Sequence, residues 1–325
     1  MKQNILLLAA LFSSVLTGCG GGGGGSPSGA PSSSTGPTVI PPAFIQRFAT
    51  GVSFLSPKHM ALVGTNLYVA DRTVNGLVSG RIAKIDTASQ ALLTATTVSN
   101  PFGVALKSTD VYYTATDASG FQGIYLMGNG SSVVALSNSN NFGGLAFYSN
   151  TKLYAANSSA VLVYPSSGNF NTSTVNIALS SPTALTMDVN KTLVYASLGD
   201  NTVVSINPSN DATTVLTQSS PVRWGPLMQP QGIAVSTNGY AYVVSQGDVH
   251  GDGGYISKVD TSTGVTEVLV SDTVGDWGSV PVGFCQATGV AIDANNEYLY
   301  VSNGNTCTNV VHHQNHDQIL KIKLP

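Results

Sequence analysis

A histidine-rich run near the C-terminus carries the side chains most often found on transition metals. His312, His313 and His316 lie within five positions and are followed by Asp317. Imidazole groups at this density can hold a divalent metal ion. The run lacks the helical His-x-x-x-His spacing and the adjacent Glu of zinc proteases, so a polar, solvated loop is the other interpretation.

A second segment alternates polar residues with glycine. Asp248, His250 and Asp252 occupy alternate positions of residues 248–254, and three of the other four residues are Gly. The pattern is similar to part of a calcium loop, but the remaining ligands and the terminal Glu are missing. The alternative is a tight connection whose Asp side chains accept hydrogen bonds from backbone amides. The same structural role is expected of three polar residues at predicted strand ends: Asp71, Asn157 and Asn303.

Aromatic and cationic side chains lie in the long segments between predicted strands. Both Trp residues of the chain, Trp224 and Trp277, are found there, and Arg223 is beside the first. Loops held by a rigid scaffold commonly carry binding residues. The candidate ligand-binding residues are therefore Arg223, Trp224, Asp248, His250, Asp252 and Trp277. The other interpretation is that the Trp side chains fill small apolar cores within their own loops.

The N-terminus has the features of a bacterial secretion signal. Lys2 precedes an apolar run at residues 5–12 that is too short to span a bilayer as a stable helix. Leu16-Thr17-Gly18-Cys19 resembles the lipobox of bacterial lipoproteins. The resemblance implies that residues 1–18 are a signal peptide and that Cys19 carries palmitate-type acyl chains.

Residues 19–42 contain the predicted lipidated Cys and a Gly/Ser/Pro-rich tract with almost no apolar side chains. Such a tract cannot bury a core and is expected to act as a disordered tether. Several acyl chains on one residue anchor more firmly than a single chain. Gly20, rather than Asp, follows the Cys, which by resemblance to the enterobacterial sorting rule favours the outer membrane. We expect a membrane-anchored domain in the periplasm or at the cell surface.

One supersecondary unit repeats six times after this tether. Each copy has an aliphatic-Tyr-small strand, centred on Tyr68, Tyr112, Tyr154, Tyr195, Tyr242 and Tyr300. Successive Tyr residues are 44, 42, 41, 47 and 58 positions apart. A strand rich in Gly and Ala precedes each Tyr, as at residues 102–106 and 288–292, and further strands follow. Four short strands in each repeat of this length predict an all-β fold, a six-bladed β-propeller with four-stranded blades.

The ends of the repeat region suggest how the ring closes. The last repeat stops at Pro325 after its third strand, whereas an apolar segment at residues 44–49 precedes the first repeat. We predict that this segment supplies the outer strand of the last blade, which leaves few free edges. The propeller domain would then span residues 43–325.

Two sets of connections open on the same face of such a ring, and this chain lengthens both. The long second-to-third-strand loops are residues 71–80, 246–254 and 303–318, and the long blade-to-blade connections are residues 218–229 and 271–287. We place the functional face there. Cys285 and Cys307 lie in two of these loops, and an oxidising compartment favours a disulfide between them. A catalytic or metal-binding thiol is the alternative.

The repeats resemble NHL-type units and the six-bladed propellers of the gluconolactonase and strictosidine-synthase superfamily, over roughly residues 44–325. The resemblance implies a metal-dependent hydrolase or lyase, lactonase-like, with a divalent metal in the central funnel held partly by a Glu of the first blade. The chain lacks the family's Glu-Gly-Pro opening, and its only Glu residues are Glu267 and Glu297.

Two functions therefore remain open. One is a membrane-anchored binding module that uses the long-loop face for a peptide, glycan or protein ligand; the other is the metal-dependent enzyme. The formal net charge of −3, without runs of one sign, gives no sign of nucleic-acid binding.

Overall fold

A computed structural model describes most of the chain after residue 43. The described ranges are residues 44–72, 80–116, 120–128, 132–137, 142–165, 175–188, 190–219, 226–246, 254–271, 287–304 and 317–325, and the side chains of residues 132–137 and 271 are not described. Every regular element in these ranges is a β-strand. None of them contains a helix that is long and apolar enough to cross a lipid bilayer.

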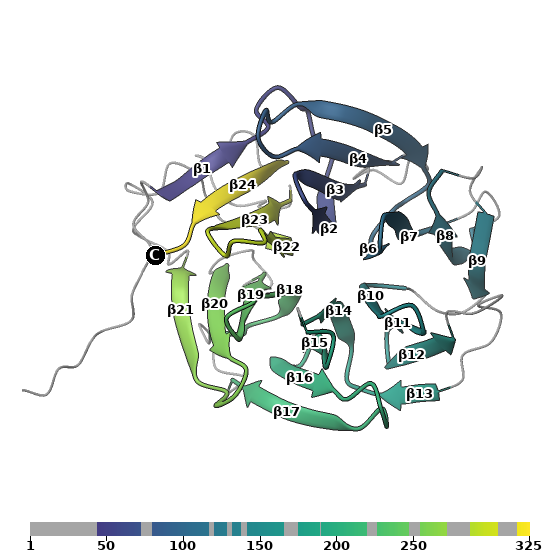
Figure 1. Cartoon of the computed structure of the whole chain (residues 1–325), viewed down its shortest axis with the longest axis vertical. Helices are drawn as coiled ribbons and strands as arrows, with labels where there is room; N and C mark the ends of the chain where they lie inside the picture. The colour runs from purple at the N-terminus through teal and green to yellow at the C-terminus, as the bar shows by residue number, and fades with distance from the viewer. Residues whose placement is uncertain are drawn as a thin grey trace, which may run out of the picture. The chain divides into compact units, whose positions relative to one another are not determined.

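Six four-stranded antiparallel sheets form the blades of a ring (Figure 1). Blade 1 contains β2 (Pro57–Val63), β3 (Asn66–Asp71), β4 (Gly80–Asp86) and β5 (Leu92–Val98). Blade 2 contains β6 (Val104–Lys107), β7 (Asp110–Thr116), β8 (Gln122–Leu126) and β9 (Ser132–Ser137). Blade 3 contains β10 (Leu145–Tyr148), β11 (Lys152–Ala156), β12 (Ala160–Pro165) and β13 (Val175–Ala178).

The other three blades repeat this order from the centre outward. Blade 4 contains β14 (Pro182–Met187), β15 (Val194–Leu198), β16 (Thr202–Ile206) and β17 (Thr213–Gln218). Blade 5 contains β18 (Pro230–Val235), β19 (Tyr240–Ser245), β20 (Tyr255–Asp260) and β21 (Thr266–Ser271). Blade 6 contains β22 (Ala287–Ile292), β23 (Tyr298–Asn303), β24 (Gln318–Lys323) and β1 (Ile45–Phe48). The predicted fold class is confirmed.

The repeated Tyr explains why blades of this composition pack together. Six hydrophobic clusters lie between the blades, one for each neighbouring pair. Each repeat Tyr is buried in the cluster that its blade shares with the next: Tyr68, Tyr112, Tyr154, Tyr195, Tyr242 and Tyr300. A single sheet buries too little apolar surface to be stable alone, so the ring distributes the core among the blade interfaces.

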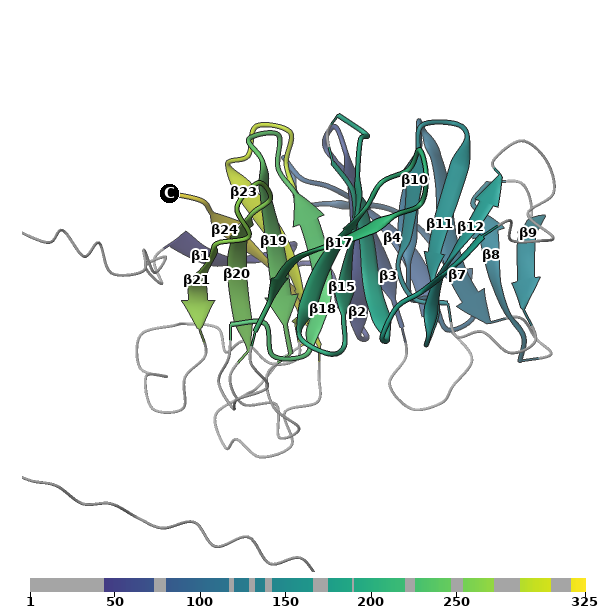
Figure 2. The same ribbon diagram turned by 90° about the horizontal axis from the view of Figure 1, so that it is seen from below.

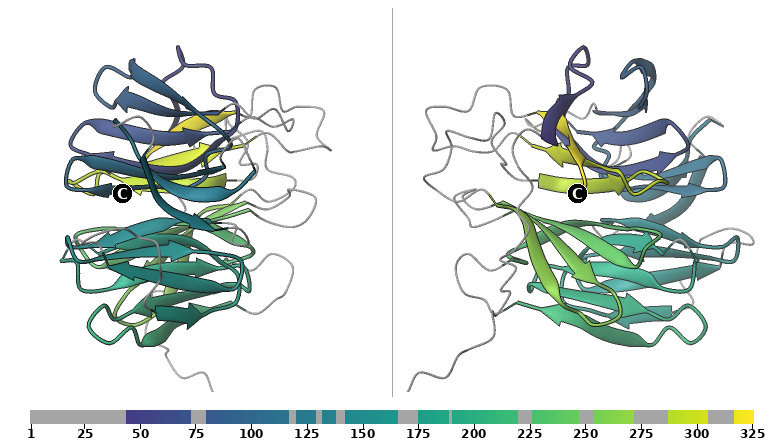
Figure 3. Two further views of the ribbon diagram at one scale, coloured as in Figure 1. Left: turned by 90° about the vertical axis from the view of Figure 1, so that its right-hand side faces the viewer. Right: turned by 60° about the vertical axis from the view of Figure 1, so that its left-hand side comes forward.

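The N-terminal strand closes the ring, as predicted. β1 pairs antiparallel with β24, with Ile45 opposite Ile322 and Phe48 opposite Ile319. Phe48 is 2 % exposed, and its ring meets the ring of Tyr300 edge-on, with centroids 5.0 Å apart. Figure 3 shows β1 along the outer edge of this blade. The outer edge of blade 6 is thereby covered by an apolar strand taken from the start of the domain.

The strands of all six blades stand side by side between two faces of the ring (Figure 2). The inner strands β2, β6, β10, β14, β18 and β22 begin on the face that carries the long connections, which we call the long-loop face. They end on the opposite face, the turn face, which carries the short turns to the second strands. The five connections predicted to be long do join strands across the predicted intervals.

Candidate functional site

Most residues singled out from the sequence lie outside the described residues. These are Cys19, Arg223, Trp224, Asp248, His250, Asp252, Trp277, Cys285, Cys307, His312, His313 and His316. The lipid anchor, the disulfide, the loop ligand face and the His metal site therefore stay predictions. The search for a site turns to the described ends of the strands that carry these loops.

The structural role expected of the strand-end polar residues is confirmed for two of them. The carboxylate of Asp71, fully buried at the end of β3, accepts hydrogen bonds from the backbone N–H groups of Leu55 and Ser56, at 2.8 and 3.0 Å. Its other oxygen accepts a bond from Nε of Arg81 at 2.8 Å. Oδ1 of Asn157 accepts the backbone N–H of Ala160 at 2.7 Å. These groups fix the loops of the long-loop face.

A pocket of about 400 Å³ lies on the long-loop face. Its walls come from the starts of inner strands and the ends of second strands in the first four blades: Arg72, Asn100, Phe102, Thr114, Ala115, Gln122, Phe142, Gly143, Asn157, Ser158, Ser181, Pro182 and Thr183. The lining combines two Phe rings with amide, hydroxyl and guanidinium groups. This pocket is on the face that the loop lengths predicted.

Hydrogen bonds to backbone N–H groups hold the polar side chains of this pocket in place. Oε1 of Gln122 accepts the backbone N–H of Phe142 at 2.7 Å, and Oδ1 of Asn157 caps its own turn. Oγ1 of Thr114 accepts the N–H of Gly103 at 2.7 Å. Because these bonds fix their side-chain oxygens, Gln122 and Asn157 present their amide groups to the pocket in fixed positions. Preorganised donors of this kind suit recognition of a polar ligand.

His59 departs from the pattern of the inner strands. His59 lies two positions before the residue that pairs with the repeat Tyr, and at this position the other five blades have only Gly or Ala: Gly103, Gly144, Ala184, Gly232 and Gly289. The reason is steric, because a Cβ on Gly289 would lie 2.4 Å from the carbonyl oxygen of Lys58 and one on Gly103 would lie 2.2 Å from that of Gly143. Blade 1 alone places a large polar side chain at this crowded position.

The imidazole of His59 is buried next to the pocket. Its residue is 7 % exposed, and its ring lies 4.8 Å from the ring of Phe102, which lines the pocket. Burial and the charge of Lys58 lower the pKa of His59 to about 4, and a hydrogen bond to the backbone of Gln231 partly offsets them. The imidazole is therefore neutral at pH 7. Its Nε2 atom is buried and has no partner within the described part of the chain.

Two cations accompany this imidazole. Lys58 precedes His59 on β2, and burial, followed by the charge of Arg72, lowers the pKa of the Lys58 ammonium, whereas Asp317 raises it. Arg72 follows directly on the anchored Asp71, and its backbone N–H bonds to the carbonyl of Ser56 at 3.1 Å. Neither Lys58 nor Arg72 makes an ion pair with a described residue. This corner, formed by Lys58, His59 and Arg72, is called the cationic corner below.

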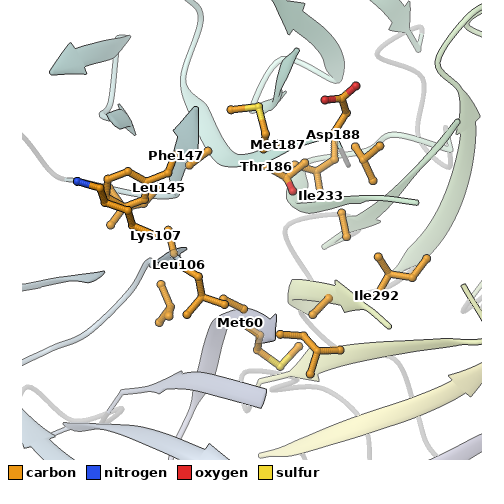
Figure 4. Close-up of a pocket in the computed structure, with 18 of the residues that line it drawn as sticks. Met60, Leu106, Lys107, Leu145, Phe147, Thr186, Met187, Asp188, Ile233 and Ile292 are labelled. Atoms are coloured by element: carbon orange, nitrogen blue, oxygen red, sulfur yellow. The ribbon is translucent and has the colours of Figure 1, made fainter. Parts of the chain in front are cut away.

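The turn face has a different pocket, of about 310 Å³ around the axis of the ring. Apolar side chains from separate blades surround it, as Figure 4 shows for Met60, Leu106, Leu145, Ile233 and Ile292. Lys107, Asp188 and Lys191 also line it. The C-terminal halves of the inner strands thus line the apolar pocket of the turn face, whereas the N-terminal half of β2 contributes to the cationic corner.

The described residues do not supply the funnel metal ligands that the lactonase resemblance implies. The described residues contain no cluster of three or more His, Cys, Asp and Glu side chains arranged for metal binding. Glu267 lies on the outer strand β21, with Oε2 3.8 Å from Nζ of Lys258. Glu297 is exposed in a turn of blade 6. Neither supplies a first-blade ligand at the axis.

The cationic corner was missed from the sequence alone, although a signal for it is present. When the six repeats are aligned on their Tyr, the position of His59 holds Gly or Ala in every other blade. The position of Lys58 holds no cation in the other blades: its residues there are Phe102, Gly143, Thr183, Gln231 and Thr288. The Tyr spacing by itself carries no trace of this exception, because it lies on the neighbouring strand.

Comparison with known proteins supports the fold and indicates no activity. The sequence matches no protein-family model and no curated protein. A Bacteroides thetaiotaomicron protein of unknown function aligns with a TM-score of 0.60 and 14 % identity, over 89 % of this chain and 75 % of that one.

Two further structures show how widely the architecture is shared. The WD40 repeats of RRP9 align with a TM-score of 0.55 and 12 % identity, over 89 % of this chain and all of that one. A Bacteroides uniformis protein provisionally named a 6-phosphogluconolactonase aligns with a TM-score of 0.50 and 14 % identity, over 74 % and 75 %. At these identities the likeness supports the overall fold alone, the six blades follow from this chain's own six sheets, and the activity is left to the site.

Proposed function

We propose that this protein is a binding propeller that recognises a glycan through the pocket on its long-loop face. The observation that carries the proposal is the lining of that pocket, where the rings of Phe102 and Phe142 accompany fixed amide and hydroxyl groups. Sugar rings present apolar C–H faces that pack on aromatic rings, and their hydroxyls exchange hydrogen bonds with amides. A peptide or protein ligand is a different outcome of the test below.

The proposal also includes a cellular location. A lipid on Cys19 would hold the domain at a bacterial membrane, most simply the outer membrane, and residues 20–42 would let the propeller reach ligands in the periplasm or at the cell surface. Labelling with radioactive palmitate tests the anchor, because Cys19→Ser should abolish label incorporation.

A glycan array tests the recognition proposal. The wild-type domain, Arg72→Gln and Lys191→Gln are applied at equal concentration, since Arg72 lines the proposed pocket and Lys191 lines the turn face. We expect wild type and Lys191→Gln to bind the same glycans and Arg72→Gln to bind at least about tenfold more weakly, the loss of one charged hydrogen bond. Equal binding by all three variants, or no binding to any glycan, would contradict the proposal.

One observation favours a second function, hydrolase or lyase chemistry. His59 lies beside Phe102, which lines the pocket, and its imidazole is neutral at pH 7, the form in which a histidine can take up a proton as a general base. The resemblance of the repeats to NHL-type and gluconolactonase-type propellers supports this candidate. Turnover of gluconolactone or p-nitrophenyl acetate, lost in His59→Phe, would establish it. Melting curves with chelator and restored metals would show whether a metal is bound.

A further inference from the structure

We propose that the turn-face pocket is a second binding site, which takes a small amphiphile with an alkyl chain and a carboxylate, such as a medium-chain fatty acid. The inference goes beyond glycan recognition, because the two pockets have no lining residue in common. Three features of the turn-face pocket carry it. Small side chains leave space at the axis, the inner end is closed, and the rim has a polar and an apolar side.

A ring of small side chains leaves the space at the axis. The residue that pairs with the repeat Tyr is Ala in five blades and Thr in blade 4, and all six line the pocket: Ala61, Ala105, Ala146, Thr186, Ala234 and Ala291. The next residue toward the turn face is large and apolar in every blade: Leu62, Leu106, Phe147, Met187, Val235 and Ile292. A mainly apolar lining is typical of ligand pockets, and about 310 Å³ suits a small ligand.

The pocket is closed toward the long-loop face. The His59 ring, directly before Met60 on β2, lies 4.8 Å from the ring of Phe102 in blade 2 and bonds to the backbone of Gln231 in blade 5. These two blades face each other across the ring (Figure 1), so the imidazole lies at the axis, where it is 7 % exposed. An alkyl chain that enters from the turn face therefore ends in apolar surroundings beside Met60.

The rim of the pocket has a polar and an apolar side. Its polar lining residues all come from three neighbouring blades, 2, 3 and 4: Lys107, Ser108, Ser149, Thr186, Asp188 and Lys191. The described lining residues of blades 5, 6 and 1 are all apolar. Figure 4 shows Thr186 and Asp188 together on one side of the pocket, across from Met60. A ligand with one polar and one apolar end matches this division.

The charge of the polar side favours a carboxylate over an ammonium group. Lys107 and Lys191 contribute two cations and Asp188 one anion. The Asp188 carboxylate already accepts hydrogen bonds from the backbone N–H of Thr192 at 2.6 Å and from its hydroxyl at 2.5 Å. Lys191 is exposed in the same turn, and the flexible stem of a Lys lets its ammonium group reach a ligand at the rim.

Isothermal titration calorimetry with octanoate and its methyl ester tests the inference. The two probes share the alkyl chain and differ in the charge of the head group, and the ester also represents an acyl chain of a membrane lipid, which has no free carboxylate. At pH 7 we expect octanoate to bind about threefold more tightly than the ester, as for an exposed ion pair. Hexanoate should bind about tenfold or more weakly than octanoate, because two fewer methylenes are buried.

Three variants locate the site. Lys191→Gln should remove the preference for octanoate over the ester and leave the affinity for the ester unchanged. Ala61→Leu fills the space at the axis and should weaken both probes by about tenfold or more. Arg72→Gln is the matched control, because Arg72 lines the pocket on the other face, and it should bind both probes as wild type does.

Each outcome decides the proposal. Absence of octanoate binding, or octanoate binding that Lys191→Gln and Ala61→Leu both leave unchanged, would overturn it. Equal affinity for octanoate and the ester would also overturn it, since the site would then take an uncharged chain. If Ala61→Leu does not fold, the chain-length series and Lys191→Gln still decide. Glycan recognition is judged separately on the array, so either proposal can fail alone.

Discussion

Blades 1 and 6 are neighbours with the same four-stranded sheet, and each departs from the repeat in a different way. Blade 6 takes its outer strand β1 from the start of the domain; every residue of β1 pairs with β24, and Ile45 and Phe48 are buried, with Phe48 packed on Tyr300. Blade 1 places Lys58 and His59 on its inner strand, where they leave a cation without an ion pair and a buried nitrogen without a donor among the described residues.

The contrast separates two reasons for breaking a repeat. An exception whose every group is satisfied contributes to stability, because it buries apolar surface and completes hydrogen bonds. An exception that leaves polar groups incompletely satisfied costs stability, so a function must account for it. By this criterion the closure of blade 6 is structural, and we propose a functional role for the cationic corner of blade 1.

Removing β1 should have the largest effect on the molecule. Deletion of residues 43–50 exposes the edge of β24 and removes the burial of Ile45 and Phe48, at about 1.5–3 kcal/mol for each side chain. We expect a loss of about 3–6 kcal/mol in the free energy of unfolding, measured by urea denaturation. Deletion of residues 20–36 is the control and should change nothing. Equal effects of the two deletions would refute the closure model.

A side chain added where blade 6 meets blade 1 should have an intermediate effect. In Gly289→Ala the new Cβ would lie 2.4 Å from the carbonyl oxygen of Lys58 and 2.9 Å from Cα of His59, so the inner strands must separate. We expect a loss of about 1–3 kcal/mol, the usual cost of overpacking, in the same denaturation assay. Gly51→Ala is the matched control, because no atom lies within 4 Å of its Cβ. If both variants are as stable as wild type, the inner strands are not close-packed.

The substitution His59→Phe should have the smallest effect on stability at neutral pH. The pKa of His59 is lowered to about 4 in the folded state, chiefly by burial, from about 6.5 in the unfolded chain. The unfolded state therefore binds the proton more tightly, and wild-type stability should fall as the pH drops from about 6.5 to about 4, by up to roughly 3 kcal/mol. His59→Phe should unfold less steeply with acid over that window while remaining close to wild type at pH 7. Parallel acid curves for the two proteins would show that His59 is not buried in its neutral form.

The regular part of the fold could be predicted from the sequence because the repeat is strong. The Tyr of each second strand marks a blade interface, and the apolar segment at residues 44–49 had no other blade to complete. Loop lengths identified the long-loop face, since connection length depends directly on where strands begin and end. The Tyr signal is strong because every blade carries it at the same place in its second strand.

The cationic corner could not be predicted in the same way. His59, Phe102 and Gln231 belong to three different blades and meet only because the ring closes. Burial of Lys58 and the free state of Nε2 of His59 depend on packing around the axis, which no local sequence pattern encodes. The Gly and Ala column that His59 interrupts is a usable signal, but it appears only after the blades are aligned.

Amide hydrogen exchange of the wild-type domain, with and without a saturating glycan identified on the array, tests the central claim that recognition occurs on the long-loop face. The account predicts slower exchange at residues 100–103 and 181–183, which lead into the inner strands there, and no change at residues 106–108 and 186–188 on the turn face. Protection confined to the turn face, with the long-loop ends of the strands unchanged, would contradict the account.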